Sequence, residues 1–354
     1  MMSNEYLKGR GAQLNTINPY NSQTYVTEHI EGLDEQFLSN EKTQFLFEYP
    51  KTIVNKVDSP DLSIMYSLNP YQGCEHGCAY CYARNVHQYW GLSAGLDFER
   101  KIIVKPDAAK LLEDCFRKSS WKSVTISLSG NTDCYQPAER KFKITRSLLE
   151  VFLKHNHPLS IITKNSLILR DIDLLRELAA LRLVQVMISV TGTNEELRSM
   201  MEPRTSSYGN RIKTIETLNK AGIACGVMVA PIIPGLNSAE IPSVIKSAAD
   251  AGAVNAGYTI VRLNGAVKVI FHDWIYKNLP DLADKVWHQI EACHGGQVSD
   301  SNFGRRMKGE GHEALAIKRL FQLALQKYMP NRSSYKLDTK LFKRPSINGQ
   351  LDLF

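Results

Sequence analysis

The sequence predicts an α/β fold, a partial (βα)6 barrel of the TIM type with an N-terminal arm and a helical C-terminal extension. Short apolar runs rich in Ile and Val recur through the middle of the chain, and a helical pattern follows each run. The runs do not alternate strictly between apolar and polar residues, which is typical of parallel strands buried on both faces. Six such units within about 200 residues fit part of a barrel, and a doubly wound sheet is the alternative.

The expected strands, in chain order, are Leu62–Leu68, Ser123–Ser129, Leu159–Thr163, Val184–Val190, Cys225–Ala230 and Ala256–Val261. Amphipathic patterns between them predict helices over Thr145–His155, Ile172–Leu181 and Asn210–Ala221. Gly222 follows the last of these helices, as expected where a helix ends.

Composition divides the chain into four regions. Residues 1–60 are polar and irregular and predict an arm laid over the main domain, residues 61–265 hold the barrel, and residues 346–354 form a flexible tail. In residues 266–345, apolar residues at helical spacing predict three helices, Val267–Leu279, Leu282–Ala292 and Glu313–Tyr328.

Overall composition excludes several classes of protein. Of 354 residues, 43% are hydrophobic and 22% are charged, as in ordinary globular proteins, so the chain is neither disordered nor collagen-like. No apolar run reaches membrane-spanning length and the N-terminus lacks a secretory signal, which predicts a cytoplasmic protein. The net charge of +7 is compatible with nucleic acid as a partner, although a basic surface without such a partner would give the same charge.

Three of the seven cysteines form the motif Cys74-x3-Cys78-x2-Cys81 just after the first expected strand. Gly73 and Gly77 permit a tightly curved loop, so the three thiolates can wrap one face of a metal centre. On a [4Fe–4S] cube, three protein ligands leave one iron open for a non-protein ligand. The alternative is a zinc ion with His76 or His87 as the fourth ligand, but the chain has no second ligand pair at zinc spacing.

This motif, with Tyr80 before its third cysteine, resembles the signature of radical S-adenosylmethionine (radical SAM) enzymes. Further stretches resemble the branch that contains spore photoproduct lyase, and the likeness covers about residues 69–237. These stretches are Ser129–Asp133, Thr163–Asn165, Ile188–Val190, Met201–Thr205 and Val229–Gly235. The segments Lys8–Ala12 and Asp300–Gly311 resemble an uncharacterised bacterial subgroup of that branch.

The resemblance implies a [4Fe–4S] cluster held by Cys74, Cys78 and Cys81, with S-adenosylmethionine on the fourth iron. Reductive cleavage of this molecule, with an electron from a donor such as flavodoxin or ferredoxin, gives methionine and a 5′-deoxyadenosyl radical that abstracts hydrogen from the substrate. The implied cofactor-binding residues are Tyr80 at the adenine, Thr132 and Asp133 at the methionyl amine, Lys164 at its carboxylate, Ser189 at the carboxylate or ribose, and Ala230. All but Tyr80 stand at strand ends, where barrel active sites gather. Packing or ordinary loop hydrogen bonds are the alternative for each of them.

One departure from the family concerns the hydrogen donor. Spore photoproduct lyase has a cysteine in the loop after its second strand, whereas this chain has Gly130–Asp133 at that place. Cys134 and Tyr135 follow and are weak candidates for a catalytic hydrogen donor, with burial in the core as the alternative for Cys134. This difference argues against reversal of a thymine dimer as the specific reaction.

Two arginines, two histidines and the last five residues are further candidates for binding a ligand or a partner. Arg305 and Arg306 could bind phosphate, or alternatively backbone carbonyls of the barrel. His155 and His157 have the spacing of a loop cap rather than of a metal site. The last five residues, Gln350, Leu351, Asp352, Leu353 and Phe354, match the pentapeptide by which bacterial proteins dock on the DNA sliding clamp, and the alternative is that the tail folds back on its own domain.

Together these features predict a radical SAM enzyme, related to lyases, that acts on DNA in repair or modification. One alternative keeps the radical chemistry but acts on RNA, a peptide or a small metabolite. The other is a non-catalytic iron–sulfur or zinc adaptor that only binds the clamp.

Overall fold

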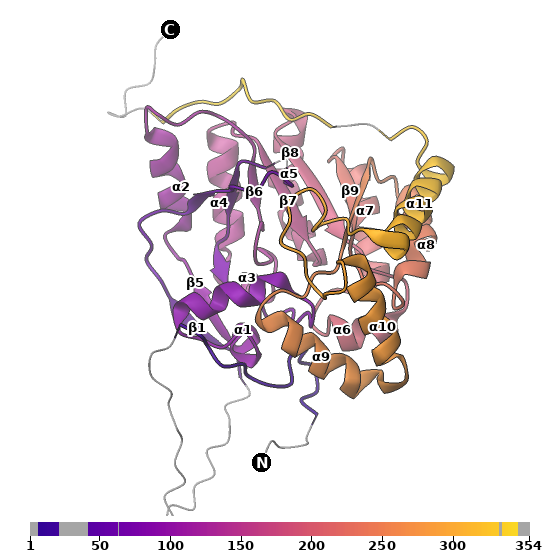
Figure 1. The fold of residues 1–354 in the computed structure, drawn as a ribbon. Helices are drawn as coiled ribbons and strands as arrows, with labels where there is room; N and C mark the ends of the chain where they lie inside the picture. The colour runs from indigo at the N-terminus through magenta and orange to yellow at the C-terminus, as the bar shows by residue number, and fades with distance from the viewer. Residues whose placement is uncertain (1–5, 21–41, 63, 333–334, 346–354) are drawn as a thin grey trace, which may run out of the picture.

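The fold is described from a computed structural model of the chain (Figure 1). The structure describes residues 6–20, 42–62, 64–332 and 335–345. The proposed clamp motif, residues 350–354, lies outside the described residues.

The main sheet contains the six expected strands side by side in chain order. They are β3 (Tyr66–Leu68), β6 (Ile126–Leu128), β7 (Leu159–Thr163), β8 (Val184–Ser189), β9 (Cys225–Ile232) and β10 (Ala256–Ile260), all parallel, with β2 (Val54–Lys56) antiparallel at the β3 edge. The first two expected strands are shorter than predicted.

The strand order decides between the two alternatives for the sheet. Each new strand adds on the same side of the previous one, so right-handed connections place the intervening helices on one face. A doubly wound sheet needs a reversal of strand order, and this sheet has none. Within the described residues no ladder joins β10 to β2, so the sheet is an open, partial barrel.

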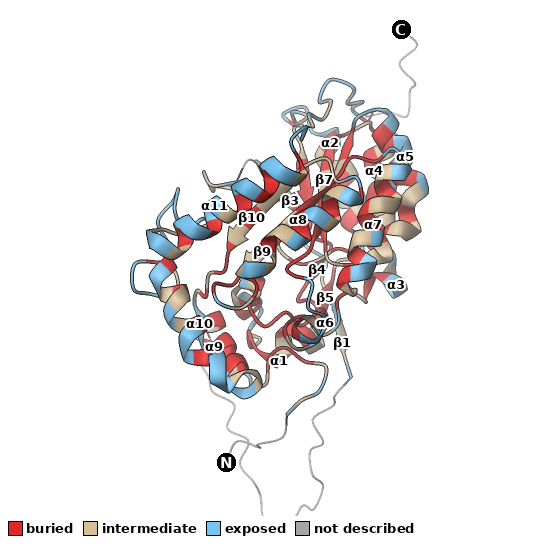
Figure 2. Ribbon diagram, turned by 90° about the vertical axis from the view of Figure 1, so that its right-hand side faces the viewer, coloured by how far each residue is buried: buried red, intermediate tan, exposed pale blue. Residues whose placement is uncertain are grey.

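Helices cover the outer face of the sheet. They are α2 (Ala108–Arg117), α4 (Ile144–Lys154), α5 (Ile172–Ala180), α7 (Tyr208–Lys220) and α8 (Ile241–Asp250), with the short elements α3 (Glu139–Phe142), η2 (Ser166–Asp171), α6 (Glu195–Met201) and η3 (Ser238–Glu240) near the strand ends. Figure 2 shows that the helices carry their exposed residues on the side away from the sheet. The predicted helices over α4, α5 and α7 are confirmed.

A second, small sheet was not predicted. It joins β1 (Gln44–Phe47), β5 (Lys101–Val104) and β4 (Tyr71–Gln72), and it lies near η1 (Tyr82–Trp90) and α1 (Leu96–Arg100) (Figure 1). β1 and β2 fall inside the region predicted as an irregular arm. β1 is mostly exposed and shows no buried alternation, and its backbone is ordered by hydrogen bonds to β5 rather than by burial of its side chains.

The predicted C-terminal helices are confirmed as α9 (Ala266–Asn278), α10 (Pro280–Cys293) and α11 (Gly311–Tyr328). α9 and α10 form a second hydrophobic core with residues around the cysteine motif, including Cys78 and Tyr80. α11 instead packs on the barrel, where Phe321 contacts Tyr258 of β10. Among the described residues, no helix is both long and apolar enough to cross a membrane.

The loop between α10 and α11 bridges the two edges of the open sheet. At the β10 edge, the amide of Ile260 donates to the carbonyl of Met307 at 3.0 Å. At the other edge, Asp61 of the β2–β3 connection accepts hydrogen bonds from Gly304 and Arg306. Arg305 pairs with Asp300 at 2.5 Å and with Glu310 at 2.9 Å. Both arginines therefore form ion pairs with carboxylates, whereas the sequence suggested phosphate or barrel carbonyls as their partners.

Candidate active site

The three motif cysteines lie in a loop that directly follows β4. Gly73 and Gly77 have φ values of +79° and +70°, which favour glycine, as expected for a tight loop. The backbone of the loop is anchored by hydrogen bonds from Cys74 N to Phe98 O at 2.9 Å and from Ala79 N to Met201 O at 3.1 Å. The curvature needed to gather three thiols is therefore held by contacts outside the loop.

The environment of the thiols suits a cationic centre. Cys74 and Cys78 are buried and Cys81 is half-buried. Burial raises the pKa of all three thiols, and for Cys74 the neighbouring Asp133, Cys78 and Cys81 add to the rise. Three buried thiols that affect one another become thiolates only where a metal centre compensates their charge. The donor set therefore fits an iron–sulfur cluster.

The two histidines considered as a fourth zinc ligand have different surroundings. His76 contacts Asp133 at 3.4 Å and Asn165 at 3.1 Å, so its ring is engaged by other side chains. His87 packs edge-on against Phe98, and both of its ring nitrogens are buried without a hydrogen-bond partner among the described residues. A cube takes its three thiolates on separate irons and needs neither histidine.

Thr132 and Asp133 lie after β6, and their side chains hold neighbouring backbone. Thr132 Oγ1 donates to Tyr71 O at 2.6 Å, while Asp133 accepts hydrogen bonds from Thr163 Oγ1 at 2.7 Å and from Lys164 N at 2.8 Å. Asp133 also accepts from Tyr135 N at 2.9 Å and lies 3.4 Å from His76 Nδ1. The hydroxyl oxygen of Thr132 can still accept a hydrogen bond from an ammonium group, whereas at Asp133 such a group would share the carboxylate oxygens with these donors.

Lys164 and Ser189 stand at the carboxyl ends of the adjacent strands β7 and β8. The Nζ of Lys164 lies 5.9 Å from the centroid of the Tyr80 ring and makes no hydrogen bond or ion pair with any described residue. Its positive charge lowers the pKa of Cys78 and Cys81, against the larger effect of their burial. The hydroxyl of Ser189 is likewise without a hydrogen-bond partner among the described residues, although the residue is 3% exposed. Two polar groups that make no hydrogen bond within the described part of the chain therefore stand at adjacent strand ends, and the charge of Lys164 acts on two of the motif thiols.

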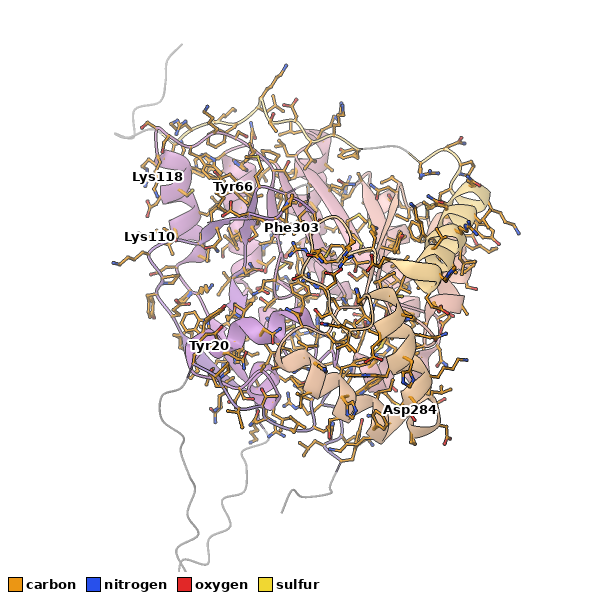
Figure 3. All side chains as sticks on the ribbon, viewed as in Figure 1. Tyr20, Tyr66, Lys110, Lys118, Asp284 and Phe303 are labelled. Carbon is orange, nitrogen blue, oxygen red and sulfur yellow. The ribbon has the colours of Figure 1, made fainter. Side chains whose placement is uncertain are left out.

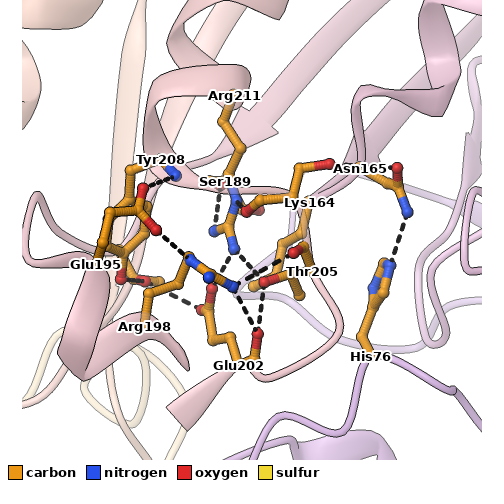
Figure 4. Close-up of polar contacts among 12 residues, drawn as sticks. His76, Lys164, Asn165, Ser189, Glu195, Arg198, Glu202, Thr205, Tyr208 and Arg211 are labelled. Carbon is orange, nitrogen blue, oxygen red and sulfur yellow. Dashed lines mark hydrogen bonds and ion pairs between the residues drawn. The ribbon is translucent and has the colours of Figure 1, made fainter. Parts of the chain in front are cut away.

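A buried network that the sequence did not predict holds Tyr80. The Tyr80 hydroxyl donates to Glu202, and Glu202 forms an ion pair with Arg211 at 2.5 Å in which both side chains are fully buried (Figure 4). Arg211 also donates to the carbonyl of Ser189 at 3.1 Å. Burial tends to raise the pKa of Glu202, but Arg211, Lys164 and Tyr80 together lower it to about 2.

Glu202 pairs with Arg211 rather than with Arg204, which is only two residues away along the chain. Arg204 lies 3.7 Å from Glu75 instead, and its amide donates to the carbonyl of His76. Arg211 belongs to α7, and nothing in the local sequence marks it as the partner of Glu202.

Two exposed aromatic residues and an arginine, from three different parts of the chain, form a second group of candidate residues. Tyr82, next to Cys81, is 51% exposed and donates from its hydroxyl to Gly130 O at 2.7 Å. Arg262 follows β10, is half-buried, and makes no hydrogen bond or ion pair with a described residue. Burial lowers the pKa of Arg262, the nearby Arg306 lowers it further, and Tyr82 and Asp61 act in the opposite direction. Phe303 is 58% exposed (Figure 3) and contacts the Arg306 guanidinium at 4.3 Å. We call Tyr82, Arg262 and Phe303 the mouth residues.

Comparison with known proteins identifies the family. Residues 68–248, just over half of the chain, match the model of the radical SAM superfamily. The chain belongs to the radical SAM superfamily. Members of this superfamily use a [4Fe–4S] cluster and S-adenosylmethionine, so the chain is a radical SAM enzyme.

Relatives by sequence are uncharacterised proteins. One from Mycobacterium tuberculosis is 33% identical over 238 residues, covering 66% of this chain and 70% of the relative. Another from Methanocaldococcus jannaschii is 30% identical over 201 residues, covering 57% of this chain and 72% of the relative. Among solved structures, spore photoproduct lyase complexed with a dinucleoside spore photoproduct is similar, with a TM-score of 0.60 at 16% identity over 82% of this chain and 81% of the lyase. The fold of this radical SAM enzyme is therefore similar to that of the lyase.

The remaining candidates of the radical SAM enzyme lie in two environments. Cys134 and Tyr135 are fully buried in the main hydrophobic core, where Thr145 donates to the carbonyl of Cys134 and the Tyr135 hydroxyl donates to Asp171 at 3.2 Å. This placement matches the packing alternative for Cys134. Ala230 is half-buried near the carboxyl end of β9.

Proposed function

We propose that this radical SAM enzyme binds its [4Fe–4S] cluster through Cys74, Cys78 and Cys81 and acts on nucleic acid, in DNA repair or modification. The observation that carries the chemistry is that the Nζ of Lys164, which makes no hydrogen bond or ion pair with a described residue, lies over the Tyr80 ring at the strand ends, and that its charge acts on the buried thiol of Cys78. When bound, the cluster supplies the electron that splits S-adenosylmethionine into methionine and a 5′-deoxyadenosyl radical.

The protein residues bind and orient S-adenosylmethionine. Lys164 binds the methionyl carboxylate through a charge-assisted hydrogen bond, and Ser189 donates to the same carboxylate or to the ribose. Thr132 and Asp133 accept hydrogen bonds from the methionyl amine. Tyr80 packs near the adenine, where Glu202 fixes its ring, and Ala230 leaves room for the nucleoside at the end of β9.

Lys164→Met tests the binding of S-adenosylmethionine. A charge-assisted hydrogen bond contributes about 1.5–3 kcal/mol, so we expect affinity to fall roughly 10–100-fold while iron and sulfide content stay unchanged. Equilibrium binding to the anaerobic, reconstituted protein measures the change. Lys110→Met, an exposed lysine on α2 (Figure 3), is the matched control. If Lys164→Met binds S-adenosylmethionine with wild-type affinity, Lys164 does not bind the methionyl carboxylate.

The mouth residues support nucleic acid as the substrate class. Arg262 is half-buried beside Arg306 and lacks a carboxylate partner among the described residues, so an anionic group of a ligand would stabilise it. Exposed aromatic rings such as those of Tyr82 and Phe303 can stack on bases. An unstacked nucleotide presents a phosphate and a flat base, which a cation and nearby exposed aromatic rings can bind. The net charge of +7 and the fold shared with a lyase that binds a dinucleoside lesion favour the same reading.

Arg262→Gln tests this substrate class. We expect affinity for a short single-stranded DNA oligonucleotide to fall about tenfold, and the dependence of log affinity on log salt to lose about one unit of slope, because one phosphate contact is lost. Arg319→Gln, which changes an exposed arginine on α11, should leave both quantities unchanged. Added DNA should also accelerate formation of 5′-deoxyadenosine by the wild type.

The alternatives predict different results in the same assays. An enzyme for RNA, a peptide or a small metabolite would form 5′-deoxyadenosine faster with that compound than with DNA. An adaptor would cleave no S-adenosylmethionine after reduction. Flavodoxin or ferredoxin as electron donor, a cytoplasmic location and docking of residues 350–354 on the sliding clamp stay predictions from the sequence.

A further inference from the structure

Part of the N-terminal segment lies directly against the cysteine loop. A Cβ atom on Gly11 would stand 1.7 Å from the carbonyl oxygen of Gly77 and 3.0 Å from the amide nitrogen of Ala79. Both contacts are with backbone, so no side chain can move aside to make room. Only glycine at position 11 allows this approach, and the loop it touches carries Cys78.

Glu99 stands between the N-terminal segment and the loop. Its side chain is fully buried and accepts hydrogen bonds from Ala12 N at 2.8 Å and from Gly11 N at 3.3 Å. Its backbone carbonyl accepts a hydrogen bond from Arg10 at 3.0 Å. A Cβ on Gly77 would lie 2.9 Å from the Glu99 carboxylate, so the carboxylate also touches the loop.

Arg84 continues the connection to the cysteine ligand itself. It pairs with Glu99 at 2.5 Å, and neither side chain is exposed. Its Nε and Nη2 both donate to the carbonyl of Cys78, at 3.0 and 2.8 Å. An unbroken chain of contacts thus runs from residues 10–12 through Glu99 and Arg84 to Cys78.

Residues 14–18 of the N-terminal segment are also held by close contacts and hydrogen bonds to residues 88–95. A Cβ on Gly95 would lie 2.0 Å from the carbonyl oxygen of Leu14, which is a second backbone contact without space. Thr16 N donates to Ser93 Oγ at 2.7 Å, and Asn18 donates to Gln88 O at 2.8 Å. Ala12 packs in a small apolar cluster with Ala94 and with Ile270 of α9, near the lower end of the molecule in Figure 1.

We propose that residues 8–12, which we call the arm cap, retain the iron–sulfur cluster. The arm cap holds the cysteine loop in its ligand-bearing conformation and shields the cluster from water, oxygen and chelators. Glu99 is the positioning residue that couples the arm cap to Cys78 through Arg84. This inference rests on the proposed role of Cys74, Cys78 and Cys81 as cluster ligands.

Gly11→Ala tests the arm cap in the reconstituted full chain. The added methyl group cannot fit against Gly77, so the arm cap must lift. Under anaerobic conditions we expect a chelator to remove iron at least about tenfold faster than from the wild type, since access follows the population of the open state. Exposure to air should bleach the cluster absorption faster by a similar factor, and trypsin should cleave at Lys8 and Arg10 sooner.

Gly209→Ala is the matched control, because a Cβ there meets nothing within 4 Å and the position lies in α7. Iron loss from this variant should equal that from the wild type. The thermal midpoint of Gly11→Ala apoprotein should stay within about 2 °C of the wild type, because the arm cap acts on the loop rather than on the barrel core. A fall in the thermal midpoint of more than about 2 °C, together with iron loss at the wild-type rate, would show that the contact at Gly11 is merely structural.

The outcomes separate the two proposals. Wild-type protein that takes up neither iron nor sulfide overturns the proposed function and the arm cap with it. A normally loaded Gly11→Ala variant that loses iron at the wild-type rate overturns the arm cap alone. Should Gly11→Ala fail to fold, Arg10→Gln, which removes the hydrogen bond to the Glu99 carbonyl, should lose iron about two- to threefold faster, and a wild-type rate would again overturn the arm cap.

Discussion

Cys78→Ala is expected to abolish cluster binding and the formation of 5′-deoxyadenosine. Changes in residues that only support metal ligands already cost about 10–100-fold in affinity or activity, so loss of one of three ligands should cost at least about 100-fold. The backbone carbonyl of residue 78, which accepts from Arg84, is kept in this variant, so the effect reports on the thiol alone. Iron and sulfide analysis after anaerobic reconstitution, followed by a 5′-deoxyadenosine assay, measures both effects.

Cys115→Ala provides the matched control for this prediction. Cys115 is half-buried on α2, against the main core and away from the cysteine loop. Its replacement should leave iron content and cleavage of S-adenosylmethionine at wild-type levels. Cleavage by Cys78→Ala at more than a few per cent of the wild-type rate would contradict the three-thiolate cluster.

Glu202→Gln is expected to give the largest loss of folding stability. The change leaves the fully buried Arg211 without its carboxylate, and breaking a buried ion pair costs about 3–5 kcal/mol. The same change replaces the charged acceptor of the Tyr80 hydroxyl by a neutral amide, which weakens that hydrogen bond, so affinity for S-adenosylmethionine should also fall. Urea denaturation of the apoprotein at neutral pH measures the free energy of unfolding.

The pH dependence of this variant follows from the pKa of Glu202. In the folded protein the pKa is about 2, below the ordinary value of 4.5, so the carboxylate contributes stability above pH 4.5. That contribution is lost as the pH falls from 4.5 towards 2. The stability difference between wild type and Glu202→Gln should therefore be constant near neutrality and should shrink below pH 4.5.

Glu216→Gln on α7 is the control for both effects. Glu216 is partly exposed and pairs with Lys220 one helical turn away, a contact that solvent screens. Its replacement should therefore lower the free energy of unfolding far less than Glu202→Gln does. A Glu202→Gln variant no less stable than Glu216→Gln would show that the buried pair does not stabilise the fold.

The features that the sequence predicted well depend on short stretches of chain. Each of β7 to β10 and each of α9 to α11 has its own apolar pattern, which the partner elements only complete. The cysteine loop is likewise local, because three cysteines and two glycines within nine residues already restrict the geometry. The positions of Lys164 and Ser189 at adjacent strand ends were predicted from the strand pattern, while their roles stay predictions.

The features that were missed depend on residues far apart in the chain. β1 and β5 are separated by more than fifty residues, and β1 buries too little of its surface to leave a pattern. Arg262 and Asp61 come near each other only because the α10–α11 loop bridges the sheet edges. Glu202 pairs with Arg211 of α7 and not with the nearby Arg204, because neighbours in sequence need not face each other on an irregular turn.

By itself, the sequence determined the strand–helix alternation, the three-cysteine motif and the family, since each is carried by residue types at fixed spacing. Only the tertiary structure decided which charges pair, as in Glu202 with Arg211 and Glu99 with Arg84, and that residues 10–12 lie on the cysteine loop. The physical reason is that a buried charge or a tight backbone contact is stabilised by whatever the fold places within a few ångströms, and spacing along the chain does not encode that distance.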